Sequence, residues 1–124
     1  VHDCVCVPLI RSFMRSRCRT SGYGTTMRAL ILNCTLKSSP GESNTDALSD
    51  VVAAALEEKG IAVDRRRLAD LDIPPGVQTD LGDGDEWPGV HQAIGQSDIL
   101  IVATPTWLGQ PSSIAKRALN GWTR

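Results

Sequence analysis

The residues best suited to chemistry lie in a polar loop that follows the first apolar run of the chain. This run, Ala29 to Leu32, fits a strand buried on both faces, and the loop after it ends in Ser43-Asn44-Thr45 at the start of a helical pattern. The free N–H groups of a first helical turn, together with the helix dipole, favour negative charge. The stretch therefore predicts a site for a phosphate group.

A second candidate loop follows the apolar run Ile99 to Ala103. It spans residues 104–111 and offers backbone amides, the hydroxyl of Thr106 and the large aromatic ring of Trp107. In open parallel sheets, ligands bind beyond the carboxyl ends of the strands, where both loops begin. Together the loops predict a ligand with a phosphate at one end and a planar ring at the other.

Helical spacing predicts the elements that position these loops. A helix is expected from Thr45 to Lys59-Gly60, with an apolar stripe formed by Ala47, Leu48, Val51, Val52, Ala55 and Leu56. A short helix is expected to start at Trp87-Pro88, with Val90 and Ile94 on its inner face and His91 beside it. A last helix, capped by Ser112 or Ser113, is expected to carry Ile114, Ala115, Ala118 and Leu119.

A strand is expected over residues 61–68, and a strand, helix and strand in succession predict a parallel pair. Arg65, Arg66 and Arg67 favour an edge position for this strand over a phosphate-binding role. Residues 69–86 predict a loop, and its acids fit a solvated surface better than a calcium site because their spacing does not match an EF-hand.

Composition excludes several classes of function. The 124 residues fit one domain, and the net charge of −1 gives no basic field for nucleic acid or an anionic membrane. No apolar run approaches the roughly 20 residues of a membrane-spanning helix. The four cysteines include no CxxC pair, so neither a metal site nor a disulfide framework is predicted. Reduced thiols in a cytoplasmic protein are the expected state.

Residues 1–26 differ from the rest of the chain. They combine three cysteines with four arginines and show no sustained period, so we expect a disordered or loosely packed extension, or upstream sequence read in frame ahead of Met27. Residues 27–124 are then expected to form the folded domain.

The two loops carry a resemblance to a known family. Residues 33–45, ending in Ser43-Asn44-Thr45, resemble the phosphate loop of the flavodoxin-like NAD(P)H-dependent FMN reductases, and residues 104–109 resemble their flavin-ring loop. The resemblance implies a flavodoxin-like three-layer α/β fold, FMN as cofactor and NAD(P)H as co-substrate. It also implies hydride transfer to a quinone-like or other small-molecule acceptor, and an assembly that is often a homo-oligomer.

The resemblance also assigns residues by position. The expected FMN-phosphate residues are Thr35, Lys37, Ser43, Asn44 and Thr45, and the expected neighbours of the isoalloxazine are Pro105, Thr106, Trp107, Leu108 and Gly109. No catalytic side chain is expected, because the cofactor carries the chemistry.

Structural alternatives stand beside these roles. The Ser43-Asn44-Thr45 stretch also fits simple helix capping, and Trp107 fits packing on the surface or against a partner. Cys34 fits a small buried residue better than a redox thiol, and Lys116 is expected on the solvent side of its helix.

The chain departs from the family pattern in strand number. A flavodoxin-like sheet has the order 2-1-3-4-5, whereas this sequence predicts only strands 2-1-3, with strands 4 and 5 missing and the third strand left as an exposed edge. The alternative to an oxidoreductase is therefore a non-enzymatic electron carrier of the flavodoxin type, or an inactive truncated fragment.

Overall fold

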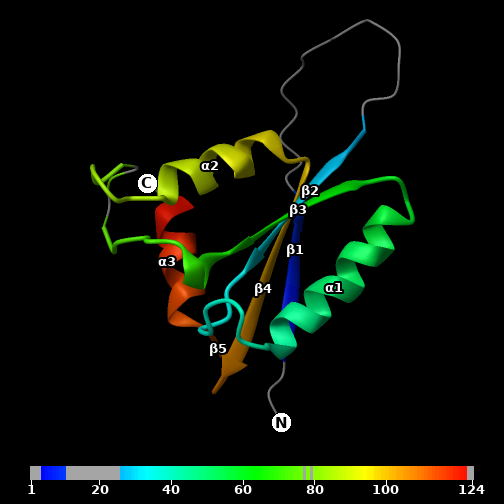
Figure 1. The fold of residues 1–124 in the computed structure, drawn as a ribbon, viewed down its shortest axis with the longest axis horizontal. Helices are drawn as coiled ribbons and strands as arrows, with labels where there is room; N and C mark the ends of the chain where they lie inside the picture. Colours follow the sequence, from blue (N-terminus) through cyan, green and yellow to red (C-terminus); the bar gives the residue numbers. More distant parts are fainter. Residues whose placement is uncertain (1–3, 11–25, 77, 79, 123–124) are drawn as a thin grey trace, which may run out of the picture.

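The computed structural model describes residues 4–10, 26–76, 78 and 80–122 (Figure 1). Three strands of its sheet are parallel: β2 (Arg28–Asn33), β3 (Ala62–Arg67) and β4 (Ile99–Trp107). β2 lies between the other two, which confirms the predicted order 2-1-3. The apolar runs of β2 and β4 are buried because both faces of these strands are covered.

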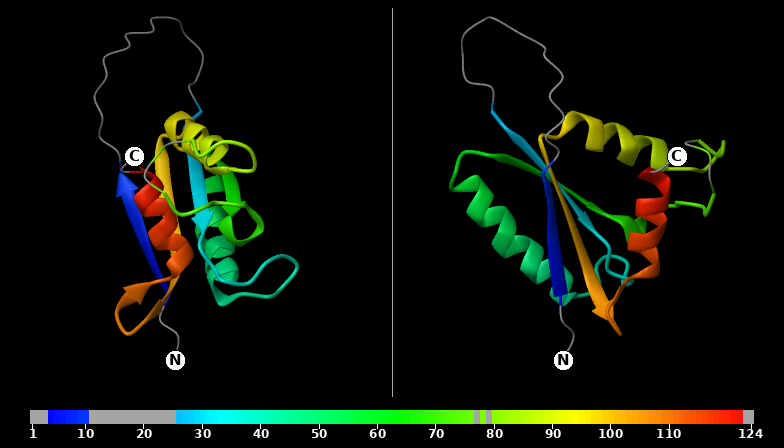
Figure 2. Two further views of the ribbon diagram at one scale, coloured as in Figure 1. Left: turned by 90° about the vertical axis from the view of Figure 1, so that its left-hand side faces the viewer. Right: turned by 180° about the vertical axis from the view of Figure 1, so that it is seen from behind.

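Helices cover the sheet on both faces, so the domain has three layers (Figure 2). Helix α1 (Asn44–Glu57) lies on one face, whereas α2 (Trp87–Gln96) and α3 (Ser113–Trp122) lie on the other. This is the flavodoxin-like α/β architecture that the sequence predicts.

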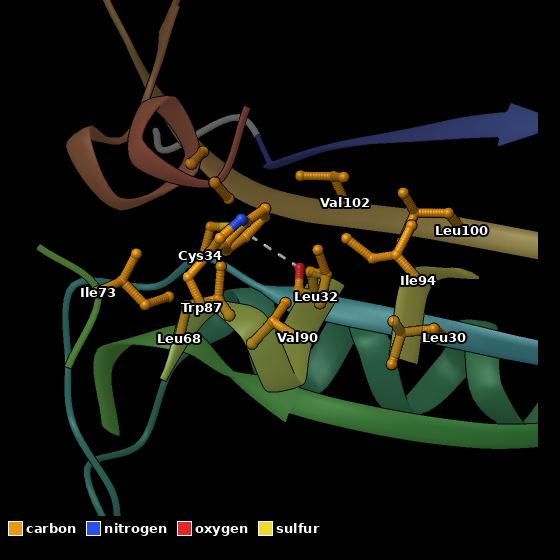
Figure 3. Close-up of a cluster of buried hydrophobic side chains, with 12 residues drawn as sticks. Leu30, Leu32, Cys34, Leu68, Ile73, Trp87, Val90, Ile94, Leu100 and Val102 are labelled. Carbon is orange, nitrogen blue, oxygen red and sulfur yellow. Dashed lines mark hydrogen bonds between the residues drawn. The ribbon is translucent and has the colours of Figure 1, made fainter. Parts of the chain in front are cut away.

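The larger core lies between the sheet and the pair α2 and α3. Trp87, at the start of α2, is fully buried at its centre, beside Leu32, Leu68 and Val90 (Figure 3). The inner-face positions Val90 and Ile94 are buried as predicted, and His91 lies exposed beside them with its ring 6.3 Å from that of Trp87. Packing around Trp87 therefore fixes both helices on the sheet.

The free side of β4 is occupied by β1 (Cys4–Ile10), which pairs with it in antiparallel register. The expectation of a loosely packed extension is therefore wrong for these residues, and so is the expectation that the third predicted strand forms an exposed edge. An extended segment gains ladder hydrogen bonds along an edge whose N–H and C=O groups would otherwise lack partners. Residues 1–3 and 11–25 lie outside the described residues.

β3 forms the edge of the sheet opposite β1, which confirms the edge position predicted from its three arginines. Arg65 pairs with Asp50 of α1, Arg66 pairs with Asp64 at 3.3 Å, and both arginine side chains are about half exposed. Such exposed pairs contribute little to stability, so their main effect is to discourage edge pairing.

The buried face of α1 differs from the predicted stripe. Thr45, Ser49 and Ala53 face the sheet, whereas Val51 is 65% exposed and Ala47 and Ala55 are exposed. Small side chains let the helix approach the strands closely, and the Ser49 hydroxyl donates to the Thr45 carbonyl at 2.7 Å, so its burial leaves no donor unpaired. On α3, Leu119 is likewise more exposed than expected, and Lys116 lies on the solvent side as predicted.

After β3 come the short η1 turn (Leu68–Asp70) and a loop that leads to α2. The acids of this loop serve its own backbone: Asp85 accepts from the amides of Leu81 and Trp87, and Glu86 accepts from that of Asp72. Within the described ranges no group of three or more His, Cys, Asp or Glu residues could hold a metal ion. In the same ranges, no helix is long and apolar enough to cross a bilayer.

Candidate functional site

The two candidate loops meet at one open cavity beyond the carboxyl ends of β2 and β4. Its volume is about 670 Å³, within the range of about 300–1,000 Å³ typical of small-molecule sites. The lining residues are Thr35, Leu36, Lys37, Glu42, Ser43, Asn44, Thr45, Asp46, Ala47, Asp50, Pro105 and Trp107. Seven of the ten predicted site residues are among them, so the two loops can touch a common ligand.

The first wall of the cavity is residues 34–43, called the phosphate loop below. The Ser43 hydroxyl donates to Thr35 Oγ1 at 3.0 Å, and Thr35 Oγ1 also accepts from the Lys37 amide at 3.3 Å. Thr35 is held in turn by its own amide, which donates to Asn33 Oδ1 at 3.1 Å. These bonds bring two hydroxyls and a helix start to one place, which is the donor chemistry that a phosphate requires.

Ser43 occupies the N-cap position of α1 in an extended conformation but makes no side-chain capping hydrogen bond. Its hydroxyl is directed to Thr35 across the loop instead. The plain capping interpretation therefore does not account for Ser43, because a serine that serves only as a cap accepts from an amide of the first turn. The first turn of α1 stays directed at the cavity that Asn44 and Thr45 line.

Lys37 adds a positive charge to the same wall. Its ammonium donates to the Glu42 carbonyl at 3.0 Å, which bridges the loop from one side to the other. The side chain is exposed, so the ammonium is held at the cavity rim by a single backbone acceptor. A lysine in this position acts as a point charge for an anion.

Three acids also line the cavity, and the sequence analysis did not select them. These are Glu42, Asp46 and Asp50, of which Asp46 pairs with Arg67 at 2.7 Å and Asp50 pairs with Arg65. Counting helical turns from Ser43 would have placed Asp46, Ala47 and Asp50 near the predicted anion site. Leu36 is the remaining unpredicted lining residue, and it gives the phosphate loop an exposed apolar side chain.

The opposite wall is formed by Pro105 and Trp107 at the end of β4. Trp107 is 41% exposed, so its ring is accessible at the cavity rather than buried in the core. A flat, partly exposed aromatic beside a phosphate-type wall fits a ligand that carries a planar ring.

The other predicted residues of this loop lie in a tight hairpin that the sequence analysis missed. β4 continues to Trp107 and pairs with β5 (Gln110–Pro111), and Leu108 and Gly109 form the turn between them. Both turn residues have positive φ, 51° for Leu108 and 73° for Gly109, as a type I′ turn requires. Thr106, Leu108 and Gly109 are not among the residues that line the cavity.

Cys34 begins the phosphate loop but does not line the cavity. Its side chain is fully buried, and burial raises the pKa of its thiol to about 12. A neutral thiol is a poor nucleophile, so Cys34 is a small core residue, as predicted, rather than a redox group.

The comparisons with known proteins agree with this geometry. A family model described as NADPH-dependent FMN reductase matches residues 27–124, and the chain belongs to that family. In a solved crystal structure, RosB holds the bound intermediate 8-demethyl-8-formylriboflavin-5′-phosphate. It matches the chain with a TM-score of 0.69 and 36% identity, over 76% of this chain and 41% of RosB.

Two curated proteins are similar in sequence. The 8-demethyl-8-aminoriboflavin-5′-phosphate synthase of Streptomyces davaonensis is 37% identical over 98 residues, which cover 72% of this chain and 38% of the synthase. A protein of Mycobacterium bovis named divalent metal cation transporter MntH is 39% identical over 97 residues, 75% of this chain and 14% of that protein. The chain thus spans well under half the length of either relative.

Proposed function

We propose that this chain binds FMN in the cavity between the phosphate loop and Trp107, as part of an oxidoreductase that takes hydride from NAD(P)H. The observation that carries the proposal is the meeting of two walls: the hydroxyls of Thr35 and Ser43 on one side and the Trp107 ring on the other. Membership of the FMN reductase family and the flavin phosphate bound to RosB support the same ligand class.

The donor set fits a flavin 5′-phosphate. The phosphate oxygens would accept hydrogen bonds from the hydroxyls of Thr35 and Ser43 and from the N–H groups of the first turn of α1. The Lys37 ammonium would leave the Glu42 carbonyl and bind the anion instead. Pro105 and Trp107 would pack against the flavin ring, and their flat apolar surfaces would exclude water from one side of it.

FMN, when bound, supplies the hydride chemistry, and the protein supplies binding, orientation and electrostatics. A quinone-like or other small-molecule acceptor, a cytoplasmic location and a homo-oligomeric assembly belong to the proposal as well. The chain would hold the phosphate at the start of α1 and place the flavin ring beside Pro105 and Trp107.

A second candidate is FMN binding without turnover, as in an electron carrier or an inactive fragment. The chain spans 38% and 41% of the flavin-related proteins it matches, so turnover is tested separately from FMN binding. The two candidates differ in whether NAD(P)H is consumed.

The test begins with a titration of the purified chain with FMN, in which the quenching of flavin fluorescence measures binding. We expect saturable binding that Ser43→Ala weakens by about tenfold or more, since a charge-assisted hydrogen bond contributes about 1.5–3 kcal/mol and 1.4 kcal/mol corresponds to about tenfold. Ser113→Ala, an exposed serine on α3, is the matched control and is expected to bind as the parent does.

Absence of FMN uptake by the parent chain would overturn the proposal. Uptake combined with flavin-dependent consumption of NADPH or NADH supports the oxidoreductase. Uptake without consumption, in the presence of a quinone acceptor, supports the electron carrier or inactive fragment instead.

A further inference from the structure

Two charged side chains near the end of β3 reach the phosphate loop without lining the cavity. The first is Arg67, whose Nη1 donates to the Gly41 carbonyl at 3.1 Å and whose Nη2 donates to Asp46 Oδ2 at 2.7 Å. Its side chain is only 13% exposed, unlike those of its neighbours Arg65 and Arg66. Arg67 thus ties the phosphate loop to the first turn of α1.

The second is Asp70 in the η1 turn. One carboxylate oxygen accepts from the Ser39 amide and the other from the Ser39 hydroxyl, both at 2.7 Å. The hydroxyl bond, then the amide bond, lower the pKa of Asp70, and nearby Arg67 lowers it further. Asp70 therefore remains an ionised acceptor at neutral pH and holds the outer bend of the phosphate loop.

Arg67 also affects the charge of the site. Asp46 lines the cavity on the first turn of α1, where its carboxylate would repel an incoming phosphate. Arg67 pairs with one oxygen of Asp46, and Asn33 Nδ2 donates to the other at 2.9 Å. Both oxygens are thus occupied by donors, so the negative charge is compensated on the side of Asp46 that faces the protein.

We propose that Arg67 and Asp70 are positioning residues that shape the phosphate loop from outside the cavity and set its affinity for the 5′-phosphate of a flavin. The inference rests on the proposed function and deepens it. Arg67 acts by holding Gly41 and by neutralising Asp46, and Asp70 acts by holding Ser39.

The test compares FMN with riboflavin, which has the same ring and no phosphate. Arg67→Ala is expected to weaken FMN binding by about tenfold or more and riboflavin binding by less than about twofold, because the lost interactions concern the phosphate wall. Arg66→Ala is the matched control: its guanidinium lies on the same strand and pairs only locally with Asp64.

Two further variants separate charge from loop shape. Asp46→Asn in the Arg67→Ala background is expected to restore part of the FMN affinity, because it removes the carboxylate charge that Arg67 no longer compensates. Asp70→Asn is expected to weaken FMN binding less than Arg67→Ala does, since it leaves the Arg67–Asp46 pair in place.

Amide hydrogen exchange without flavin gives a readout independent of FMN binding. Asp70→Asn is expected to speed exchange of the Ser39 amide at least about threefold, and Arg67→Ala to speed exchange across residues 38–43, relative to Arg66→Ala. An equal ratio of FMN affinity to riboflavin affinity in the parent and in Arg67→Ala would overturn the inference. The proposed function, FMN binding by the parent, would still stand. If the parent takes up no FMN, both the inference and the proposed function fail. Unchanged amide exchange in both variants would show that neither Arg67 nor Asp70 positions the phosphate loop.

Discussion

The Ser112 hydroxyl joins the two walls of the site: it donates to the Cys34 carbonyl at 2.7 Å and accepts from the Ala115 amide at 3.1 Å. Ser112 is therefore the N-cap of α3, as predicted, and also a link to the start of the phosphate loop. Its own amide donates to Thr104 Oγ1 at 3.0 Å, so the segment after the β5 strand is fixed to the end of β4 as well. These buried bonds set the spacing of the loops that follow β2 and β4.

Ser112→Ala is expected to lower the free energy of unfolding by about 1–3 kcal/mol, because it removes a helix cap and leaves the buried Cys34 carbonyl without its hydroxyl donor. Urea unfolding followed by circular dichroism measures the change. Ser113→Ala is the control and is expected to stay within about 0.5 kcal/mol of the parent, since Ser113 is exposed. Equal losses in the two variants would show that the link is unimportant.

Burial of Cys34 predicts a pH dependence of stability. The folded pKa of about 12 lies above the usual thiol value of 9.0, so the folded state retains the proton where the unfolded state has lost it. Stability from this group is complete below pH 9.0 and declines as pH rises toward about 12, by up to about 1.4 kcal/mol per pH unit.

The measurement is the free energy of unfolding at a series of pH values for the parent and for Cys34→Ala. The alanine variant is less stable at neutral pH because it leaves a small cavity, and its stability is expected to decline less steeply above pH 9.0. Parallel curves for the two proteins would show that folding does not raise the pKa of the Cys34 thiol.

The sequence predicts the centre of the fold because its strands are buried on both faces. Runs such as Ala29 to Leu32 contain only apolar residues, and the succession of strand, helix and strand over residues 29–68 predicts the parallel pair that the structure has. The meeting of the two loops follows from the same topology, since both leave the carboxyl ends of adjacent strands.

The failures have separate physical causes. Hydrophobicity alone selected Val51 for the buried face of α1, whereas close packing against the sheet selects small residues such as Ser49. The β1 strand depends on pairing with Ile99–Trp107, a long-range contact that no local pattern in residues 4–10 reveals. The β4–β5 turn was missed because Leu108 occupies a positive-φ position that leucine rarely adopts.

The approach of α3 to Trp87 depends on one glycine. A Cβ built on Gly121 would lie 2.5 Å from Cε2 of Trp87, and Trp87 is fully buried and cannot move aside. Gly121→Ala is therefore expected to lower the melting temperature, with a cost of about 1–3 kcal/mol from overpacking.

Gly89→Ala on α2 is the matched control for this substitution. A Cβ there meets nothing within 4 Å, so the gain in helix propensity is expected to leave the melting temperature unchanged or raise it. A Gly121→Ala protein as stable as the parent would show that α3 can move away from Trp87 at little cost.

Leu108 combines an unfavourable backbone conformation with a side chain that packs against nothing. Its φ is 51°, and its relative exposure of 102% means that no burial offsets the strain. Leu108→Asn is expected to stabilise the protein by about 0.5–1 kcal/mol, because asparagine followed by glycine is the favoured pair in a type I′ turn. Gly109→Ala, at φ 73°, is expected to act in the opposite direction.

Thermal unfolding of the two variants and the parent measures both effects: the melting temperature is expected to rise in Leu108→Asn and to fall in Gly109→Ala. FMN binding is expected to be unchanged in Leu108→Asn, because Leu108 lies outside the cavity lining. A destabilised Leu108→Asn protein would show that the exposed leucine makes a favourable contact in solution. Unchanged stability combined with weaker FMN binding would instead place Leu108 against the flavin, as the resemblance implied.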